Sequence, residues 1–245
     1  MRHGGPDADA ARAMSTAITA LVLGDAGFTE ATVLVEGSRI AAVGVSPVDR
    51  AALRQRAAEH VDAGNSWVIP GLIDAHAHGY AALLRGTENS LPLELWSLYT
   101  VLYGRAYDAA AMRAAILLGA AERIRAGITG WIDHSPMVHL AEAALAAHAE
   151  SGLRVGWAAF LHDISDDTLL GLALPPEVAR LAGGTPPFDP DAYAQRFGEL
   201  VQAAKPDRVS VLLGPNAPQR CSPAAWRLWR DLRDRHGVGV HTCTS

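Results

Sequence analysis

The sequence predicts an α/β fold in which a small N-terminal β-domain precedes an incomplete (β/α)8 barrel of the TIM type. From residue 67 onward, short apolar runs that suit buried strands alternate with helical stretches about five times. Polar residues directly follow several of these runs, at the carboxyl ends of strands, where parallel barrels carry their active sites. This part of the chain is shorter than the roughly 250 residues that eight strand–helix units occupy, so we expect an incomplete barrel.

Composition and charge favour a soluble globular protein. Apolar residues make up 49% of the 245 residues and charged residues 19%, as in packed domains. The net charge of −5 gives no reason to expect a nucleic-acid or membrane partner. No apolar run approaches the roughly 18 residues of a membrane span, and residues 1–13 do not resemble a signal peptide. We therefore expect a cytoplasmic protein with a disordered N-terminus at residues 1–13.

The small β-domain is predicted over residues 14–66, and the partial barrel over residues 67–245. Short runs of β-forming residues surround a Glu-Gly-Ser turn in the first of these regions, which is a hairpin signal. The predicted elements are strands at 17–23, 31–35 and 39–44, a turn at 36–38 and a short helix within 47–63.

The first barrel strand is predicted at residues 68–78, and it ends in a pair of histidines. Its four branched apolar residues form a nearly continuous run, which is typical of a strand buried on both faces. Side chains two apart on a strand point to the same side, so we expect Asp74, His76 and His78 on one face. Two imidazoles on a rigid strand can bind one divalent metal when other strands add ligands.

Residues 70–78 read Pro-Gly-Leu-Ile-Asp-Ala-His-Ala-His. This run resembles the first-strand signature of the amidohydrolase superfamily, whose members are metal-dependent hydrolases built on (β/α)8 barrels. The resemblance implies that residues 14–66 are the small β-domain that flanks such barrels and that they act as a scaffold.

A helix is predicted at 108–126, because Asp108 can cap its start and Gly127 can end it. The strand that follows, 128–134, is similar to the second strand of the same family. His134 at its end is a candidate substrate contact, with a supporting role outside the site as the alternative. Trp96 in the preceding loop is another candidate, with packing in a helix as the alternative.

The later elements continue the alternation of strand and helix. Residues 215–222 resemble the loop after the fourth strand in the deaminase-like branch, where Gln219 is a candidate contact to a ring substrate. Ser222 followed by Pro223 predicts the start of a helix that Gly237 ends. The predicted elements are a helix at 137–151, a strand at 153–161, a loop at 171–190, a helix at 191–204, a strand at 207–214, a helix from 222 to 237 and a strand at 238–245.

The fifth predicted strand, residues 238–245, allows two registers against the family pattern Val-His-Thr-His with a glutamate three residues later. In one register Cys243 replaces the metal ligand; in the other His241 is the ligand and Thr244 stands at the glutamate position. We expect His241 to be the ligand, because imidazole matches the family, although Cys243 could bind zinc as thiolate. Neither register supplies the glutamate that moves protons, so no catalytic residue is assigned.

The resemblance also indicates one metal ion rather than two. Members with two ions usually bridge them with a carboxylated lysine on the fourth strand. The predicted fourth strand contains no lysine, and Lys205 lies before Pro206, outside it. The resemblance therefore implies one divalent ion, Zn²⁺ or Fe²⁺, held by His76, His78 and His241.

The function that this resemblance implies is hydrolysis of carbon–nitrogen bonds other than peptide bonds. We expect deamination of an amino-substituted N-heterocycle by metal-bound hydroxide. The small-molecule substrate is an N-heterocycle or a cyclic amide, and the chain could form a homo-oligomer. The alternatives are a truncated, inactive fragment, a subunit that needs a partner to complete the barrel, and a metal-binding or scaffold protein that uses only the histidine pair.

Overall fold

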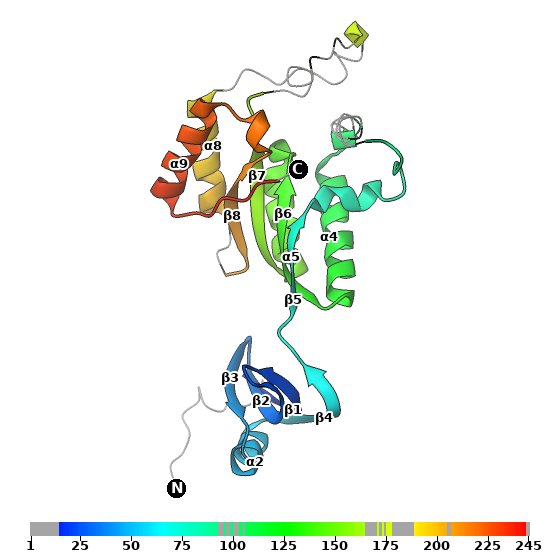
Figure 1. Ribbon diagram of the computed structural model, residues 1–245, viewed down its shortest axis with the longest axis vertical. Coiled ribbons are helices and arrows are strands. Elements are labelled where there is room, and N and C mark those ends of the chain that lie inside the picture. Colours follow the sequence, from blue (N-terminus) through cyan, green and yellow to red (C-terminus); the bar gives the residue numbers. More distant parts are fainter. Residues whose placement is uncertain are drawn as a thin grey trace. The chain divides into compact units, whose positions relative to one another are not determined.

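The computed structural model describes residues 15–92, 96, 99, 103–104, 106–164, 171, 173, 175–177, 189–204 and 207–243 (Figure 1). The chain forms two compact units, Met1–Pro70 and Gly71–Ser245, and each has its own sheet. The expected disorder of residues 1–13 and most of the expected loop at 171–190 lie outside the described residues. No helix in the described part of the chain is long and apolar enough to cross a bilayer.

The N-terminal unit is a four-stranded sheet of order β3-β2-β1-β4 with one helix. β1 pairs antiparallel with β2 and parallel with β4. The expected helix is present and starts at Ser46, whose side chain accepts a hydrogen bond from the amide of Asp49. β4 was not predicted, because its sequence is polar and its side chains are mostly exposed, so no apolar pattern marks it. The elements are β1 (Ser15–Gly24), β2 (Gly27–Glu36), β3 (Arg39–Gly44), α2 (Pro47–Arg56) and β4 (Glu59–Val68).

The second unit has a parallel sheet of order β5-β6-β7-β8, with helices between successive strands (Figure 1). This arrangement confirms the predicted α/β class with a parallel sheet. The elements are β5 (Leu72–Ala77), η1 (Gly79–Leu84), α4 (Ala109–Arg125), β6 (Ile128–Ser135), η2 (Val138–Leu140), α5 (Ala141–Ser151), β7 (Arg154–Leu161), α8 (Pro190–Ala203), β8 (Val209–Pro215), η3 (Pro218–Arg220) and α9 (Pro223–His236).

Local signals in the sequence explain where the helices of this unit begin and end. Asp108 accepts a hydrogen bond from the amide of Ala111 at the start of α4. Gly237 follows α9 with a φ of 63°, a left-handed conformation that favours glycine. The core contains large apolar side chains from sheet and helices, including Trp157 of β7 and Trp229 of α9.

The first predicted barrel strand differs from the structure in two ways. Residues 68–78 are not one strand: β4 ends at Val68 in the N-terminal unit, and β5 begins at Leu72 in the second unit. The expected burial on both faces is also wrong, because Leu72 is 54% exposed and Ile73 is 73% exposed. Among the described residues β5 pairs only with β6, so its other edge has no strand beside it.

The fifth predicted strand is present only as a single bridge. Val240 pairs in parallel with Leu213 of β8. The amide of Leu213 donates to the carbonyl of Gly239 at 3.0 Å, and the amide of His241 donates to the carbonyl of Leu213 at 2.8 Å. These bonds hold the segment beside the carboxyl-terminal half of β8, and Thr244 and Ser245 lie outside the described residues.

Candidate metal centre

Four histidines and one cysteine meet at the carboxyl ends of the parallel strands. His76 Nδ1 lies 2.6 Å from His241 Nε2, although the two residues are 165 positions apart in sequence. Cys243 Sγ lies 3.3 Å from His76 Nε2 and 3.2 Å from His134 Nδ1. The ring centres of His76 and His78 are 5.1 Å apart. The fold therefore brings side chains from β5, β6 and the segment after α9 to one point.

Two sets of these side chains could hold a metal ion. One consists of His76, His134 and His241, and the other of His76, His78 and Cys243; the ligand atoms in each set lie within 4.8 Å of one another. His76 belongs to both sets. The predicted combination of His76, His78 and His241 is neither of these sets: among the described residues His241 groups with His134, and His78 groups with Cys243.

Burial lowers the pKa of three imidazoles in the cluster, those of His76, His134 and His241. Burial lowers the pKa of His134 to about 3, against a weaker opposing effect of the Gly214 backbone. Burial, together with the neighbouring histidines, also lowers the pKa of His76 and of His241. Neutral imidazole is the form that binds metal ions, so these side chains need not lose a proton to do so. Burial raises the pKa of the Cys243 thiol. A bound cation would act in the opposite direction, because it stabilises the thiolate.

The chemistry of the donors indicates which ions the cluster fits. Imidazole nitrogen and thiol sulfur suit zinc and other transition metals, whereas magnesium and calcium prefer oxygen. His134 Nε2 is buried and makes no hydrogen bond of good geometry with the described residues. His78 Nδ1 lies 2.6 Å from the backbone oxygen of His134 and donates to it, which leaves His78 Nε2 free to bind a metal.

The candidate substrate contacts lie in different environments. His134 is fully buried inside the cluster, with its ring centre 3.9 Å from that of Phe160. Trp96 is half-buried, and its amide donates to the carbonyl of Pro92. Gln219 is exposed in η3. Contact of these three side chains with a substrate stays a prediction.

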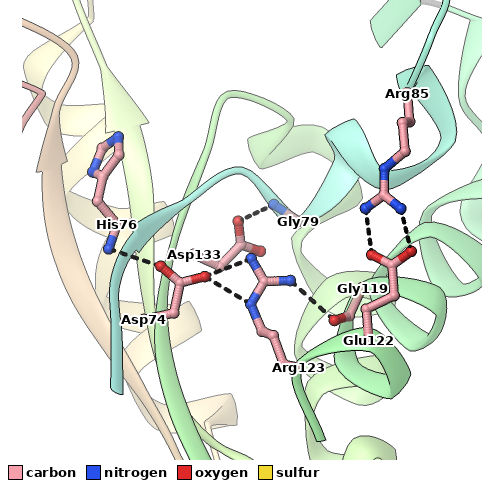
Figure 2. A network of polar contacts seen from close by, with 8 residues as sticks. All are labelled: Asp74, His76, Gly79, Arg85, Gly119, Glu122, Arg123 and Asp133. Atoms are coloured by element: carbon pink, nitrogen blue, oxygen red, sulfur yellow. Dashed lines mark hydrogen bonds and ion pairs between the residues drawn. The ribbon is translucent and has the colours of Figure 1, made fainter. Parts of the chain in front are cut away.

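Asp74 does not join the histidines as the alternation of a strand predicts. Its carboxylate pairs with Arg123 of α4, at 2.8 Å, and Figure 2 shows the imidazole of His76 directed away from this pair. The pairing of β5 with β6 is irregular between Asp74 and Ala77, so strict alternation fails there.

Sequence reasoning also missed a buried pair beside the cluster. Asp133 Oδ2 accepts a hydrogen bond from His148 Nε2 at 2.8 Å, and Asp133 Oδ1 accepts one from the amide of Gly79 at 2.7 Å. Both side chains of the pair are almost fully buried. The one signal was an acidic residue directly after the apolar Trp131 and Ile132 of a strand, because a buried carboxylate requires partners.

Three comparisons with known proteins show what this chain is similar to. The profile of the Amidohydrolase family matches residues 67–244. A 5-methylthioadenosine/S-adenosylhomocysteine deaminase from Syntrophobacter fumaroxidans is 31% identical over 86% of this chain and 43% of its own length. A 5'-deoxyadenosine deaminase from Methanothermobacter thermautotrophicus is 27% identical over 90% of this chain and 46% of its own.

A solved structure extends the likeness to three dimensions. The adenosine deaminase from Xanthomonas campestris with bound zinc superposes with a TM-score of 0.74 at 25% identity, over 94% of this chain and 49% of that one. The chain thus spans a little less than half the length of each of these three proteins.

Proposed function

Because the chain belongs to the amidohydrolase family, we propose that it forms the metal-binding part of a hydrolase that deaminates an amino-substituted N-heterocycle. The observation that carries this proposal is the convergence of two overlapping ligand sets at one place: His76 with His134 and His241, and His76 with His78 and Cys243. The names of the relatives support an adenosine-type nucleoside as the substrate. In this proposal the parallel sheet is the first part of a (β/α)8 barrel.

Zinc is the proposed ion, and Fe²⁺ is the alternative, since imidazole and thiolate donors suit both. A divalent ion bound there would lower the pKa of water and so supply a nucleophile near neutral pH. His76 would be the central ligand, because it belongs to both possible sets. His78 would be oriented by its bond to the backbone of His134. In the described part of the chain both sets hold only imidazole and thiol donors, so the roles assigned are binding and orientation of the ion.

The experiment that tests this function measures zinc content and ammonia release on the same purified protein. We expect about one zinc per chain, and ammonia from 5'-deoxyadenosine or adenosine but not from cyclic amides. His76→Ala should abolish both, because it removes the ligand common to the two sets. His139→Ala is the control, since His139 is exposed in η2 of the same unit. A parent protein that binds no zinc and releases no ammonia from a broad panel of amino-heterocycles would overturn the proposal.

A second candidate function is that of a subunit, or an inactive fragment, that needs a partner to complete the barrel. The observation in its favour is the exposed apolar edge at β5, where Ile73 is 73% exposed. One equivalent of zinc without turnover would favour this alternative, whereas turnover by the isolated chain would exclude it.

A further inference from the structure

The strand that carries the histidine pair is held only loosely by its backbone. β5 pairs with β6 at Leu72, Ile73, Asp74 and Ala77, and the register is irregular between Leu72 and Ile73 and between Asp74 and Ala77. Ala75 and His76 therefore have no partner residue on β6. Because β5 also lacks a strand on its other edge among the described residues, backbone pairing alone does not fix the orientation of His76.

A charged side chain of α4 holds the start of this segment (Figure 2). Arg123 Nε donates to Asp74 Oδ2 at 2.9 Å, and Arg123 Nη2 lies 2.8 Å from the same oxygen. Arg123 Nη1 donates to the carbonyl of Gly119 at 3.0 Å. The guanidinium lies 3.8 Å from the ring centre of Trp131, where cation–π attraction stabilises it. Asp74 Oδ1 in turn accepts a long hydrogen bond of 3.4 Å from the amide of His76.

A buried carboxylate holds the other end. Asp133 Oδ1 accepts from the amide of Gly79, the residue that follows His78, and Figure 2 shows this bond beside the first pair. His148 of α5 donates to the second oxygen of Asp133 and so fixes the carboxylate. A Cβ at position 79 would lie 2.7 Å from Asp133 Oδ2, so only glycine lets the backbone approach this closely.

We propose that Asp74–Arg123 and Asp133–His148 are positioning pairs that fix the two ends of residues 74–79 and thereby aim His76 and His78 at the metal. The proposal rests on the proposed function, because it requires that metal. Trp131 joins the pairs: Arg123 covers its ring, and the His148 ring centre lies 5.1 Å away. None of the four residues belongs to either ligand set, so they act through the backbone of the ligand segment.

The experiment compares zinc affinity, cobalt absorption and stability in Arg123→Met, Asp133→Ala and a control. The control is Arg113→Met, because Arg113 also lies on α4 and pairs with a carboxylate, Glu150 of α5, away from β5. Zinc affinity is measured by competition with a chromophoric chelator, and the melting temperature is measured without metal. We expect the first two variants to bind zinc about tenfold more weakly or worse, as for other residues that orient ligands. Arg113→Met should stay within twofold of the parent.

Two further readouts separate positioning from a general loss of stability. The visible absorption of the Co²⁺-loaded Arg123→Met and Asp133→Ala proteins should shift, because the ligand geometry changes. Asp133→Asn should recover most of the zinc affinity, since its amide oxygen can still accept from Gly79. If Arg123→Met does not fold, Arg123→Lys replaces it: it keeps the charge but cannot bind Asp74 and Gly119 together, so we expect the same loss of zinc affinity and the same spectral shift.

The outcomes also separate this proposal from the proposed function. Variants with the zinc affinity and cobalt spectrum of the parent would overturn the positioning role and leave the proposed function standing. A parent chain that binds no zinc and releases no ammonia from the panel of amino-heterocycles would overturn both.

Discussion

Cys243 places a thiol between two imidazoles, 3.2 Å from His134 Nδ1 and 3.3 Å from His76 Nε2. At such distances a sulfur can share a metal ion with both rings. His241 is the other candidate from the same segment, and it lies 2.6 Å from His76. The two registers of the segment at 238–245 therefore lead to different metal ligands at nearly the same place.

Substitution of Cys243 by serine distinguishes these ligands. If the thiolate binds, the Co²⁺-loaded parent should show a sulfur-to-metal charge-transfer band in the near ultraviolet, and Cys243→Ser should lose it. Zinc affinity should fall by about tenfold or more, because a thiolate ligand is lost. Cys221→Ser is the control, since Cys221 is buried outside the cluster and donates to the carbonyl of Ala217. A parent without the band would assign the ligand to His241.

Gly79 offers a test that changes no ligand. Gly79→Ala places a methyl group 2.7 Å from Asp133 Oδ2, so the hydrogen bond from the Gly79 amide must lengthen or break. We expect the free energy of unfolding to fall by about 1–3 kcal/mol, as when a buried polar group loses its partner, and zinc binding to weaken. Gly198→Ala in α8 meets only ordinary contacts and should raise stability by about 0.5–1 kcal/mol. Urea unfolding measures the change in the free energy of unfolding of both variants, and the two changes should have opposite signs. Equal changes would contradict the close approach of the Gly79 backbone to Asp133.

The residues predicted from the sequence are those whose signal is local. His76 and His78 stand out because two imidazoles two positions apart mark a ligand pair on a strand. Asp133 and His148 do not, because their partnership exists only after α5 packs on β6. His134 could be noticed as a histidine at a strand end, but only the fold shows that it lies buried among the other histidines.

At the level of elements, the start of α9 is tied to the end of β7. The Ser222 side chain accepts from the amides of Ala224 and Ala225, which caps the helix. Ser222 also donates to Asp163 through its hydroxyl at 2.5 Å and its amide at 2.8 Å. The cap therefore joins a helix to the strand end that precedes it by about 60 residues.

Ser222→Ala should consequently destabilise the protein more than the loss of an ordinary cap. We expect about 2 kcal/mol, at the upper end for a capping residue. Asp108→Ala removes a cap in the same unit that makes one local bond, to the amide of Ala111, and should cost about 1 kcal/mol. The measurement is the free energy of unfolding in urea. A smaller loss for Ser222→Ala than for Asp108→Ala would contradict the proposed link between α9 and β7.

The sequence predicted the helices better than the strands. Caps such as Asp108 and Ser222 and the terminal Gly237 act within one turn, so they can be recognised without the fold. β4 lacks an apolar pattern because its stability comes from backbone pairing with β1. The segment around Val240 looks like a full strand, yet it forms one bridge with β8.

On the scale of the whole molecule, the apolar run of β5 suits a strand that is covered on both faces, whereas the structure exposes Leu72 and Ile73. Leu72 and Ile73 could not be assigned to a surface from sequence, because the apolar run is the same whether or not other parts of a fold cover the faces of the strand. The incomplete barrel stays a prediction, and so does a homo-oligomer that covers this edge.

A pair of isoleucine substitutions tests the exposure of β5. Ile73→Ser should change the free energy of unfolding by less than about 0.5 kcal/mol, because the side chain is 73% exposed. Ile116→Ala in α4 should lower it by about 2–4 kcal/mol, since Ile116 is fully buried. Both are measured by urea unfolding. A loss above about 1.5 kcal/mol for Ile73→Ser would mean that another chain covers the edge, and sedimentation would then show whether it is a second copy.

The long sequence separation of His76 and His241 has a kinetic consequence. The cluster cannot exist until β5, β6, β8 and the segment after α9 have assembled, so a bound ion has no site in a partly folded chain. Interactions formed late in folding lower the rate of unfolding without accelerating folding. The metal would therefore stabilise the native state kinetically. Its presence should lengthen the lifetime of the native state. A chelator should shorten that lifetime and leave the rate of refolding unchanged.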